Sequence, residues 1–397
     1  MCNPACFTCL NPQASPGGDA KAHPMTAWQL ASALRACRAQ VLTVVPGFGV
    51  TPVWEALGRP MLSYHEEIAC GLAHGASLAG VRSATLLKTH GLLKAANQVS
   101  SALSSGVRSG WVLLVFEDPL ATSSDNILAA RPFLRALNLP HLPCEDQPEL
   151  VLAEAFARSE RVGLPVAVVI DGRQMMSRDP DAPTPEPWTT VCPPVLPPSR
   201  DPQRHLVAPL LVPYQHEVLQ ARLAGQPADS VPRPELPVLP ERAELRAWEP
   251  FFTAFQQHRP PFVAGDTTLS SLYGLPPFGC VDASTCLGGS LPIGLGALAA
   301  GVPEVWSLAG DFSFLSMGPL ALLEAAQRNL PLKVAIFANG VAAATGGQPV
   351  NLDLLDLALA PYASRTRRLA PGQDPHPLLR ATREAAGLQI LVVDTRE

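Results

Sequence analysis

Short apolar runs separated by amphipathic stretches recur along most of this chain of 397 residues. Each run is rich in Val, Leu and Ile and is continuous rather than alternating, which is the pattern of strands buried on both faces of a parallel sheet. The stretches between the runs have apolar residues at helical spacing. In the first half the runs are VLTVV, SATLLK, WVLLVF and LPVAVVID. The pattern therefore predicts an α/β fold built on parallel sheets.

Proline divides the chain into two such domains. Residues 177–243 contain the segments PDAPTPEP, CPPVLPPS and PRPELPVLP, which favour an extended linker, with a helical insert near residues 214–224. We expect a first α/β domain over residues 24–176 and a second over residues 244–397. Residues 1–23 are polar and rich in Gly and Pro, so we expect a flexible N-terminus.

The second domain contains a strand–helix–strand pattern. An apolar run at residues 305–309 is followed, from about Gly318, by a helical pattern with Pro319 in its first turn, and a second apolar run covers residues 332–338. Such a unit joins two parallel strands by a crossover helix. We therefore expect both strands to end at the same edge of the sheet.

Polar residues follow both of these strands. The first strand runs into Gly310-Asp311 and the second into Asn339-Gly340. Open α/β folds bind ligands at this carboxyl edge, and a carboxylate with an amide oxygen suits Mg²⁺ that keeps other positions for phosphate oxygens. Asp and Asn are also common turn residues after strands. The arrangement favours a cofactor that carries a diphosphate.

Gly310-Asp311 followed by Asn339 resembles the metal–diphosphate motif of thiamine diphosphate-dependent enzymes. The resemblance implies that the side chains of Asp311 and Asn339 bind Mg²⁺ together with the main-chain carbonyl of Val341. Phe312 stands where many relatives have a second Gly, a departure that concerns the local turn. The cofactor-binding residues implied in this segment are Gly310, Asp311, Phe312, Ser313, Asn339 and Val341.

The first domain has a matching signal at His65-Glu66-Glu67. It is similar to the strand-to-helix junction at which the pyrimidine-binding domain of these enzymes presents a Glu to N1′ of the aminopyrimidine, and Ala69 favours Glu66 for this role. A carboxylate that holds a proton on N1′ promotes removal of the C2 proton of the thiazolium. Acids are also favoured at helix N-termini in general. Beside the metal motif, we interpret Glu66 as catalytic.

A third segment, Thr285-Cys286-Leu287-Gly288, resembles the family's loop that holds the two cofactor rings in a V shape. The resemblance implies that Leu287 is the apolar wedge between the rings and that the carbonyl of Thr285 accepts a hydrogen bond from the 4′-amine. The alternative is an ordinary Gly-rich entry to a helix. The implied fold has a pyrimidine-binding and a diphosphate-binding domain, with the cofactor between Glu66 of one subunit and Asp311 of another, in a homodimer or a dimer of dimers.

Several stretches resemble the alpha subunit of indolepyruvate:ferredoxin oxidoreductase, among them GASLAGVRSATLLKTHGLLKAA, VLLVFEDPLATSSDN and HLVAPLLVPYQHEVLQARL. That subunit carries a Cys run for iron–sulfur clusters, which these 397 residues lack. Two domains without an inserted middle domain also resemble the short phosphonopyruvate and sulfopyruvate decarboxylases. We therefore expect non-oxidative decarboxylation of a 2-oxo acid. The likeness to the indolepyruvate enzyme weakly favours a substrate with an aryl or apolar side chain.

The implied reaction runs through a C2 ylid and an enamine, whose protonation releases an aldehyde. His90 is a candidate for this acid, and an ordinary loop His is the alternative. Carboligation of the enamine is equally compatible with these residues. Two other hypotheses stay open: a subunit of a 2-oxo acid oxidoreductase that hands electrons to a separate iron–sulfur partner, and a thiamine diphosphate-binding partner protein without turnover.

Composition narrows the setting. The net charge of −5 gives no electrostatic reason to expect nucleic acid or an anionic membrane as a partner. The N-terminus lacks a secretion signal, and the uncharged stretch 283–303 is too rich in Gly, Ser and Thr for a membrane span. We expect a cytoplasmic protein with reduced cysteines. Of its nine cysteines, Cys2, Cys6 and Cys9 form the one cluster, which either binds a metal or is incidental.

Overall fold

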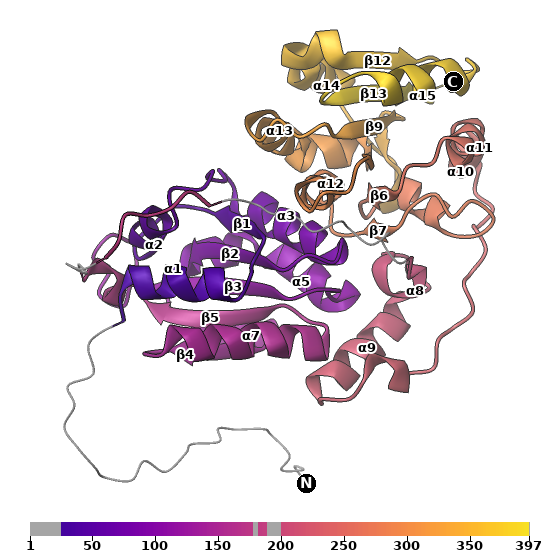
Figure 1. Ribbon diagram of the computed structural model, residues 1–397. Helices are drawn as coiled ribbons and strands as arrows, with labels where there is room; N and C mark the ends of the chain where they lie inside the picture. The colour runs from indigo at the N-terminus through magenta and orange to yellow at the C-terminus, as the bar shows by residue number, and fades with distance from the viewer. Residues whose placement is uncertain (1–24, 178–181, 189–199, 397) are drawn as a thin grey trace, which may run out of the picture.

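The structure is a computed structural model that describes residues 25–177, 182–188 and 200–396. The N-terminal segment 1–23, including the Cys2, Cys6 and Cys9 cluster, lies outside the described residues, as do two stretches of the proline-rich linker. Two parallel sheets, each covered by helices on both faces, form the framework (Figure 1). The predicted parallel α/β architecture is confirmed.

The first sheet has the strand order β1-β2-β3-β5-β4, and every neighbouring pair is parallel. Its strands are β1 (Val41–Val44), β2 (Ser83–Lys88), β3 (Trp111–Glu117), β4 (His141–Cys144) and β5 (Val166–Asp171). The central strands are almost wholly buried because helices cover both faces. Its helices are α1 (Ala27–Ala36), α2 (Val50–Ala56), α3 (Glu66–Leu78), α4 (Thr89–Lys94), α5 (Ala96–Ser105), α6 (Ala130–Ala136) and α7 (Pro148–Val162). One apolar core joins α1, α2 and α7 to the sheet, and another joins α3, α5 and α6 to its opposite face.

The second sheet has the order β12-β13-β9-β8-β6-β7 and is also parallel throughout. Its strands are β6 (Phe262–Gly265), β7 (Ala283–Ser284), β8 (Val305–Gly310), β9 (Lys333–Ala338), β12 (Thr366–Leu369) and β13 (Gln389–Asp394), and the short pair β10 (Val341–Ala342) and β11 (Gln348–Pro349) forms a separate antiparallel hairpin. The helices are α10 (Ala243–Arg246), α11 (Glu249–Gln257), α12 (Ser290–Ala299), α13 (Asp311–Gln327), α14 (Leu352–Leu359) and α15 (Pro375–Glu384). Short 3-10 turns occur at η3 (Leu269–Gly274), η4 (Ala343–Thr345) and η5 (Ala360–Arg365).

The two domains share one apolar core, in which α3 packs directly against α12. The contact is close because both helices present glycines to each other. A Cβ on Gly75 would overlap the backbone of Ile293, and a Cβ on Gly296 would overlap the carbonyl oxygen of Leu72. Glycine therefore lets the two backbones touch, which fixes how the domains sit relative to one another.

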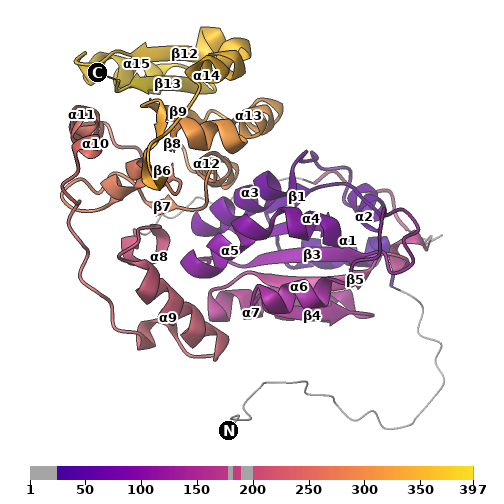
Figure 2. The same ribbon diagram turned by 180° about the vertical axis from the view of Figure 1, so that it is seen from behind.

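The described parts of the linker pass beside both domains (Figure 2). They contain η1 (Gln174–Met176), α8 (Pro202–His205), α9 (Val212–Leu223) and η2 (Ala228–Ser230). Helix α8 contacts α5 of the first domain and β7 of the second, and α9 packs on α5. The helical insert expected near residues 214–224 corresponds to α9, which packs on the first domain. Across the described residues, no helix combines the length and apolarity needed to cross a membrane.

One element differs from the expectation. Helix α13 begins at Asp311, directly after β8, and not near Gly318, so Pro319 lies inside the helix rather than in its first turn. The carboxylate of Asp311 accepts the N–H of Phe312, which satisfies one of the free donors at the helix start. Gly318 and Pro319 are typical of a helix start, but here the acidic residue at the strand end, Asp311, begins the helix.

Candidate active site

The residues expected to bind metal and diphosphate lie at the carboxyl edge of the second sheet. Strands β8 and β9 are parallel neighbours whose pairing ends at Gly310, so Asp311 and Asn339 follow at the same edge. Asp311 is almost wholly buried; its Oδ1 accepts the N–H of Phe312 and its Oδ2 the N–H of Gly340, both at 2.7 Å. One carboxylate thus ties the tip of β8 to the tip of β9.

Burial raises the pKa of the Asp311 carboxyl, and the backbone N–H groups of Gly340 and Phe312 act in the opposite direction. The Asn339 Oδ1 accepts the N–H of Val341 at 3.3 Å, which closes the turn into the β10–β11 hairpin. Gly340 has φ of 72°, a conformation that favours glycine. A buried carboxylate and an adjacent amide oxygen form an oxygen ligand set of the kind that Mg²⁺ takes.

The N-terminus of α13 lies at the same edge. Phe312 is half exposed, whereas the Ser313 hydroxyl is buried and links two segments, since it donates to Asp266 Oδ2 and accepts the N–H of Gly288 at 2.9 Å. Free N–H groups at the start of a long helix attract phosphate oxygens. Gly310, Asp311, Phe312 and Ser313 therefore form a suitable cradle for a diphosphate.

Asp266, directly after β6, is a site residue that the sequence reasoning missed. It is fully buried at the same sheet edge, and burial raises its pKa to about 7, although the Ser313 hydroxyl and the N–H of Gly288 favour the ionised form. Its Oδ1 has no hydrogen-bond partner among the described residues. The available signal was an apolar run, FVAG, followed directly by Asp, the same pattern that singled out Asp311.

The loop expected to hold the cofactor rings lies beside this network. Thr285 and Cys286 are buried, and Leu287 between buried neighbours is partly exposed. Gly288 has φ of 79°, and a Cβ there would lie 2.7 Å from the Cβ of Met317 on α13. The loop is therefore pressed against the same helix whose N-terminus forms the diphosphate cradle.

Several buried polar atoms of these segments lack hydrogen-bond partners in the described chain, which is what a site for a polar cofactor would show. Asp266 Oδ1, Thr285 Oγ1 and Ser290 Oγ are buried and have no hydrogen-bond partner among the described residues. Buried polar atoms are normally paired. A ligand that brings donors and acceptors to this edge, as thiamine diphosphate with Mg²⁺ does, suits the residues present.

The first-domain candidates, Glu66 and His90, lie on the successive helices α3 and α4. Glu66 opens α3, and its Oε2 is 2.9 Å from the Nζ of Lys94. Gly91 leaves room for it, because a Cβ there would lie 2.8 Å from Glu66 Cγ. His90, the neighbour of Gly91, has its Nε2 at 2.7 Å from Asn126 Oδ1, in the loop after β3.

The two halves are not joined directly. In the described chain, no hydrogen bond or ion pair links Glu66 to Asp311 or Asn339, and the ionic partner of Glu66 is Lys94. One link between the domains close to Glu66 is Cys286, whose thiol lies 3.8 Å from Glu67 Oε1 and donates to Gln98 Oε1 at 3.3 Å. The α3–α12 contact thus places the ring-holding loop beside the helix that carries Glu66.

Comparisons with known proteins agree with this geometry. Residues 268–397 match the family model of the C-terminal TPP binding domain of thiamine pyrophosphate enzymes. The indolepyruvate oxidoreductase subunit IorA of Methanothermobacter thermautotrophicus is 39% identical over 106 residues, which are 26% of this chain and 17% of that protein. IorA of Archaeoglobus fulgidus is 37% identical over 106 residues, with the same shares of each chain. The chain thus spans less than a fifth of the length of these relatives.

Solved structures share the fold across nearly the whole chain. The thiamine diphosphate-dependent 4-hydroxybenzoylformate decarboxylase of Rhodococcus jostii RHA1 has a TM-score of 0.64 at 16% identity, covering 94% of this chain and 99% of that one. The benzoylformate decarboxylase of Polynucleobacter necessarius has a TM-score of 0.62 at 11% identity, covering 93% and 98%. The two-domain fold and the resemblance to thiamine diphosphate-dependent enzymes are confirmed.

Proposed function

We propose that this protein is a thiamine diphosphate- and Mg²⁺-dependent enzyme that decarboxylates a 2-oxo acid without net oxidation. One observation carries the proposal: the buried carboxylate of Asp311 ties two parallel strand tips together at the start of α13, within the segment that matches the cofactor-binding family model. Asp311, Asn339 and the carbonyl of Val341 would hold Mg²⁺, and the N-terminus of α13 would hold the diphosphate.

When bound, thiamine diphosphate supplies a thiazolium ring that adds to the ketone of the 2-oxo acid and accepts the electron pair released with CO₂. The protein supplies the proton chemistry. Glu66 would hold a proton on N1′ of the aminopyrimidine, and the side chain of Leu287 would keep the two rings bent toward each other. His90 would give a proton to the product carbon before an aldehyde leaves.

The proposal extends to the assembly. Glu66 is paired with Lys94 and not with the second-domain site of the same chain, which supports a cofactor shared between Glu66 of one subunit and Asp311 of another. We therefore propose a homodimer or a dimer of dimers. The substrate class, a 2-oxo acid with an aryl or apolar side chain, is supported by the fold shared with decarboxylases of aryl 2-oxo acids.

A subunit of a 2-oxo acid oxidoreductase is the second candidate, and the likeness to IorA favours it. In that case electrons would pass to a separate iron–sulfur partner. In the residues that the structure describes, no group of three or more His, Cys, Asp or Glu side chains is arranged to hold a metal ion, while Cys2, Cys6 and Cys9 lie outside them. Carboligation and a non-catalytic binding role stay as further alternatives.

The test measures CO₂ release from a panel of 2-oxo acids by the chain loaded with thiamine diphosphate and Mg²⁺, with and without an artificial electron acceptor. We expect release without the acceptor. Release only in its presence would establish the oxidoreductase candidate instead. Glu66→Gln should abolish exchange of the C2 proton of bound cofactor while leaving the cofactor bound, and Glu67→Gln on the same turn is the matched control, expected to retain exchange.

A further inference from the structure

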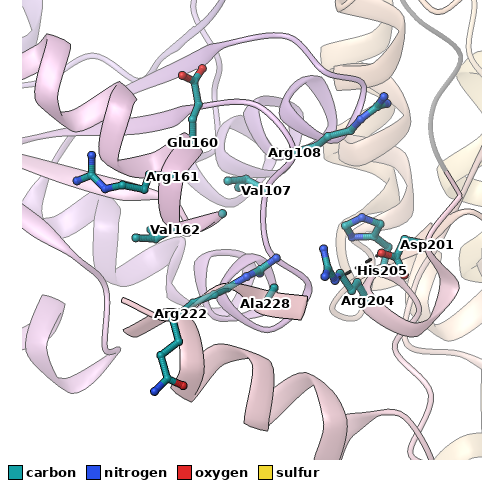
Figure 3. Close-up of a pocket in the computed structure, with 12 residues that line it drawn as sticks. Val107, Arg108, Glu160, Arg161, Val162, Asp201, Arg204, His205, Arg222 and Ala228 are labelled. Atoms are coloured by element: carbon teal, nitrogen blue, oxygen red, sulfur yellow. Dashed lines mark ion pairs between the residues drawn. The ribbon is translucent and has the colours of Figure 1, made fainter. Parts of the chain in front are cut away.

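A polar cavity of about 280 Å³ lies away from the cofactor site, where the linker helices α8 and α9 meet the first domain (Figure 3). Its floor is formed by the ends of α5 and α7, at Val107 and Gly163. Arg204, His205 and Arg222 line it from the linker, and Arg108 lines it from the loop after α5, with its guanidinium directed away from the other two arginines. Figure 3 shows the guanidinium groups of Arg204 and Arg222 directed toward one another from different helices.

Arg222 is the unusual member of this cavity. Its side chain is only 6% exposed, and in the described part of the chain it forms no ion pair and its Nη1 has no hydrogen-bond partner. Burial lowers its pKa to about 10, and the nearby charge of Arg204 acts in the same direction. Burying a guanidinium without a carboxylate partner is unfavourable in free energy, so we expect a negative charge near Arg222 to compensate.

Two helix ends supply part of that compensation. Gly106 caps the C-terminus of α5 and Gly163 that of α7, with φ of 79° and 66°, and a Cβ on Gly163 would lie 3.1 Å from Arg222 Nη2. A helix C-terminus carries about half a negative charge, which stabilises a nearby cation. The helix ends help to explain why Arg222 can be buried, yet its Nη1 has no hydrogen-bond partner among the described residues.

The charges around the cavity leave an excess of positive charge. Asp201 and Asp229 are shared between Arg204 and Arg233, with Arg204 Nη2 at 2.5 Å from Asp229 Oδ1 and Arg233 Nη2 at 2.9 Å from Asp201 Oδ2. The third carboxylate, Glu160, lines the cavity but pairs with Arg82 at 2.6 Å, so in the described chain Arg222 has no ion-pair partner of its own. The cavity thus has the electrostatic character of an anion site.

We propose that this cavity binds the phosphate group of a small phosphorylated molecule. A carboxylate is satisfied by the fork of one guanidinium, whereas a tetrahedral phosphate accepts hydrogen bonds from several directions, as the separate approaches of Arg204 and Arg222 require. The cavity is near the lower size limit of small-molecule sites, roughly 300 Å³, so it admits a phosphate with a few further atoms.

The arginine-lined cavity is distinct from the cofactor site, and one hydrogen bond links the segment after α8 to the segment before the ring-holding loop. The N–H of Val207, two residues after His205, donates to Ser284 Oγ at 2.6 Å, and Ser284 directly precedes the loop that holds the cofactor rings. Because the cofactor site also has a phosphate cradle, a binding test must separate the two sites, and substitutions at the arginines do so.

The experiment titrates inorganic phosphate and glycerol 3-phosphate into the full chain by calorimetry, at ionic strength matched with chloride, first without and then with thiamine diphosphate and Mg²⁺. We expect saturable binding of at least one phosphate compound in both states and none of acetate. Arg222→Met and Arg204→Gln should weaken binding at least about 10-fold. The control Arg131→Gln removes an exposed arginine of α6 and should leave binding unchanged.

Three outcomes would overturn the proposal: no saturable binding of either phosphate compound, acetate binding as tightly as phosphate, or binding that survives both arginine substitutions. The last outcome would place the phosphate in the cofactor cradle instead. Should Arg222→Met fail to fold, as judged by circular dichroism, Arg204→Gln decides the matter alone, because Arg204 is at the rim and partly exposed.

Discussion

The contact between Gly91 and Glu66 permits a substitution that moves the proposed catalytic acid without removing it. Gly91 lies inside α4, and a Cβ at this position would be 2.8 Å from Glu66 Cγ, 3.1 Å from Glu66 Oε1 and 3.3 Å from Leu87 Cβ. Leu87 is held in the buried strand β2, whereas the carboxylate of Glu66 ends a flexible side chain. Gly91→Ala should therefore displace Glu66 and leave the fold intact.

The magnitude follows from these distances. Carbon atoms in contact prefer separations of about 3.5 Å, so Glu66 Cγ must retreat by roughly 0.7 Å. A misplacement of about 1 Å in a catalytic arrangement can cost about 100-fold in rate. We expect Gly91→Ala to slow C2 proton exchange about 10- to 100-fold. Stability should hardly fall, because Ala is favoured over Gly inside a helix by up to about 1 kcal/mol.

The assay follows exchange of the C2 proton of bound thiamine diphosphate in D₂O by quenched-flow NMR, with cofactor affinity and Tm measured on the same samples. Leu93→Ala, an exposed position on the same helix, is the control and should exchange at the wild-type rate. Wild-type exchange in Gly91→Ala would refute the reasoning. So would a large fall in Tm, because it would show that Leu87 or the helix gives way instead of Glu66.

Two further predictions concern the cofactor site and a buried histidine of the first domain, His74, which stacks on Trp111. Asp311→Asn keeps the shape of the side chain but turns one acceptor into a donor that faces the N–H of Gly340 or Phe312. Loss of a hydrogen-bond partner of a metal ligand typically weakens metal binding by roughly 10- to 100-fold, and we expect Mg²⁺-dependent binding of thiamine diphosphate to weaken by more than this, because Asp311 is a proposed ligand itself. Fluorescence titration of the cofactor at several Mg²⁺ concentrations measures the change. Burial lowers the pKa of His74 to about 4, against about 6.5 in the unfolded chain. Below pH 6.5 the unfolded chain therefore binds a proton that the folded chain does not, and the free energy of unfolding falls as pH falls toward 4, by about 2 kcal/mol at pH 5. The difference in unfolding free energy between wild type and His74→Phe should narrow by that amount from pH 7 to pH 5 in urea titrations, and a constant difference would contradict the assigned pKa.

Much of the fold could be predicted because its signals are local. Continuous apolar runs mark strands that are buried on both faces, and β1, β2, β3, β5, β8, β9 and β13 all occupy runs of this kind. The adjacency of Asp311 and Asn339 also followed from local reasoning, since one crossover helix forces two parallel strands to end at the same edge.

The contacts that escaped prediction join segments distant in the sequence, whereas the start of α13 is a local feature. Asp266 becomes part of the site through Ser313, 47 positions away, and no local pattern announces that hydrogen bond. The start of α13 at Asp311 was missed because the neighbouring Pro319 reads as a helix start, although a helix can retain an internal proline when packing compensates for one lost hydrogen bond. The pairing of Glu66 with Lys94 depends on how α3 and α4 lie together in space.

The glycine contacts between α3 and α12 explain how a site built from two domains keeps its geometry. Glu66 opens α3, and α12 begins directly after the ring-holding loop, so the relative position of these helices sets the position of the acid against that loop. Side chains can change rotamer, but touching backbones cannot yield without separating the helices, and the contact at Gly75 and Gly296 is backbone to backbone. The buried chain from Cys286 to Gln98 adds a polar link across the same interface. This contact therefore holds the two domains in one arrangement, and we expect the freedom needed for substrate entry to lie in the loops at the sheet edges rather than between the domains.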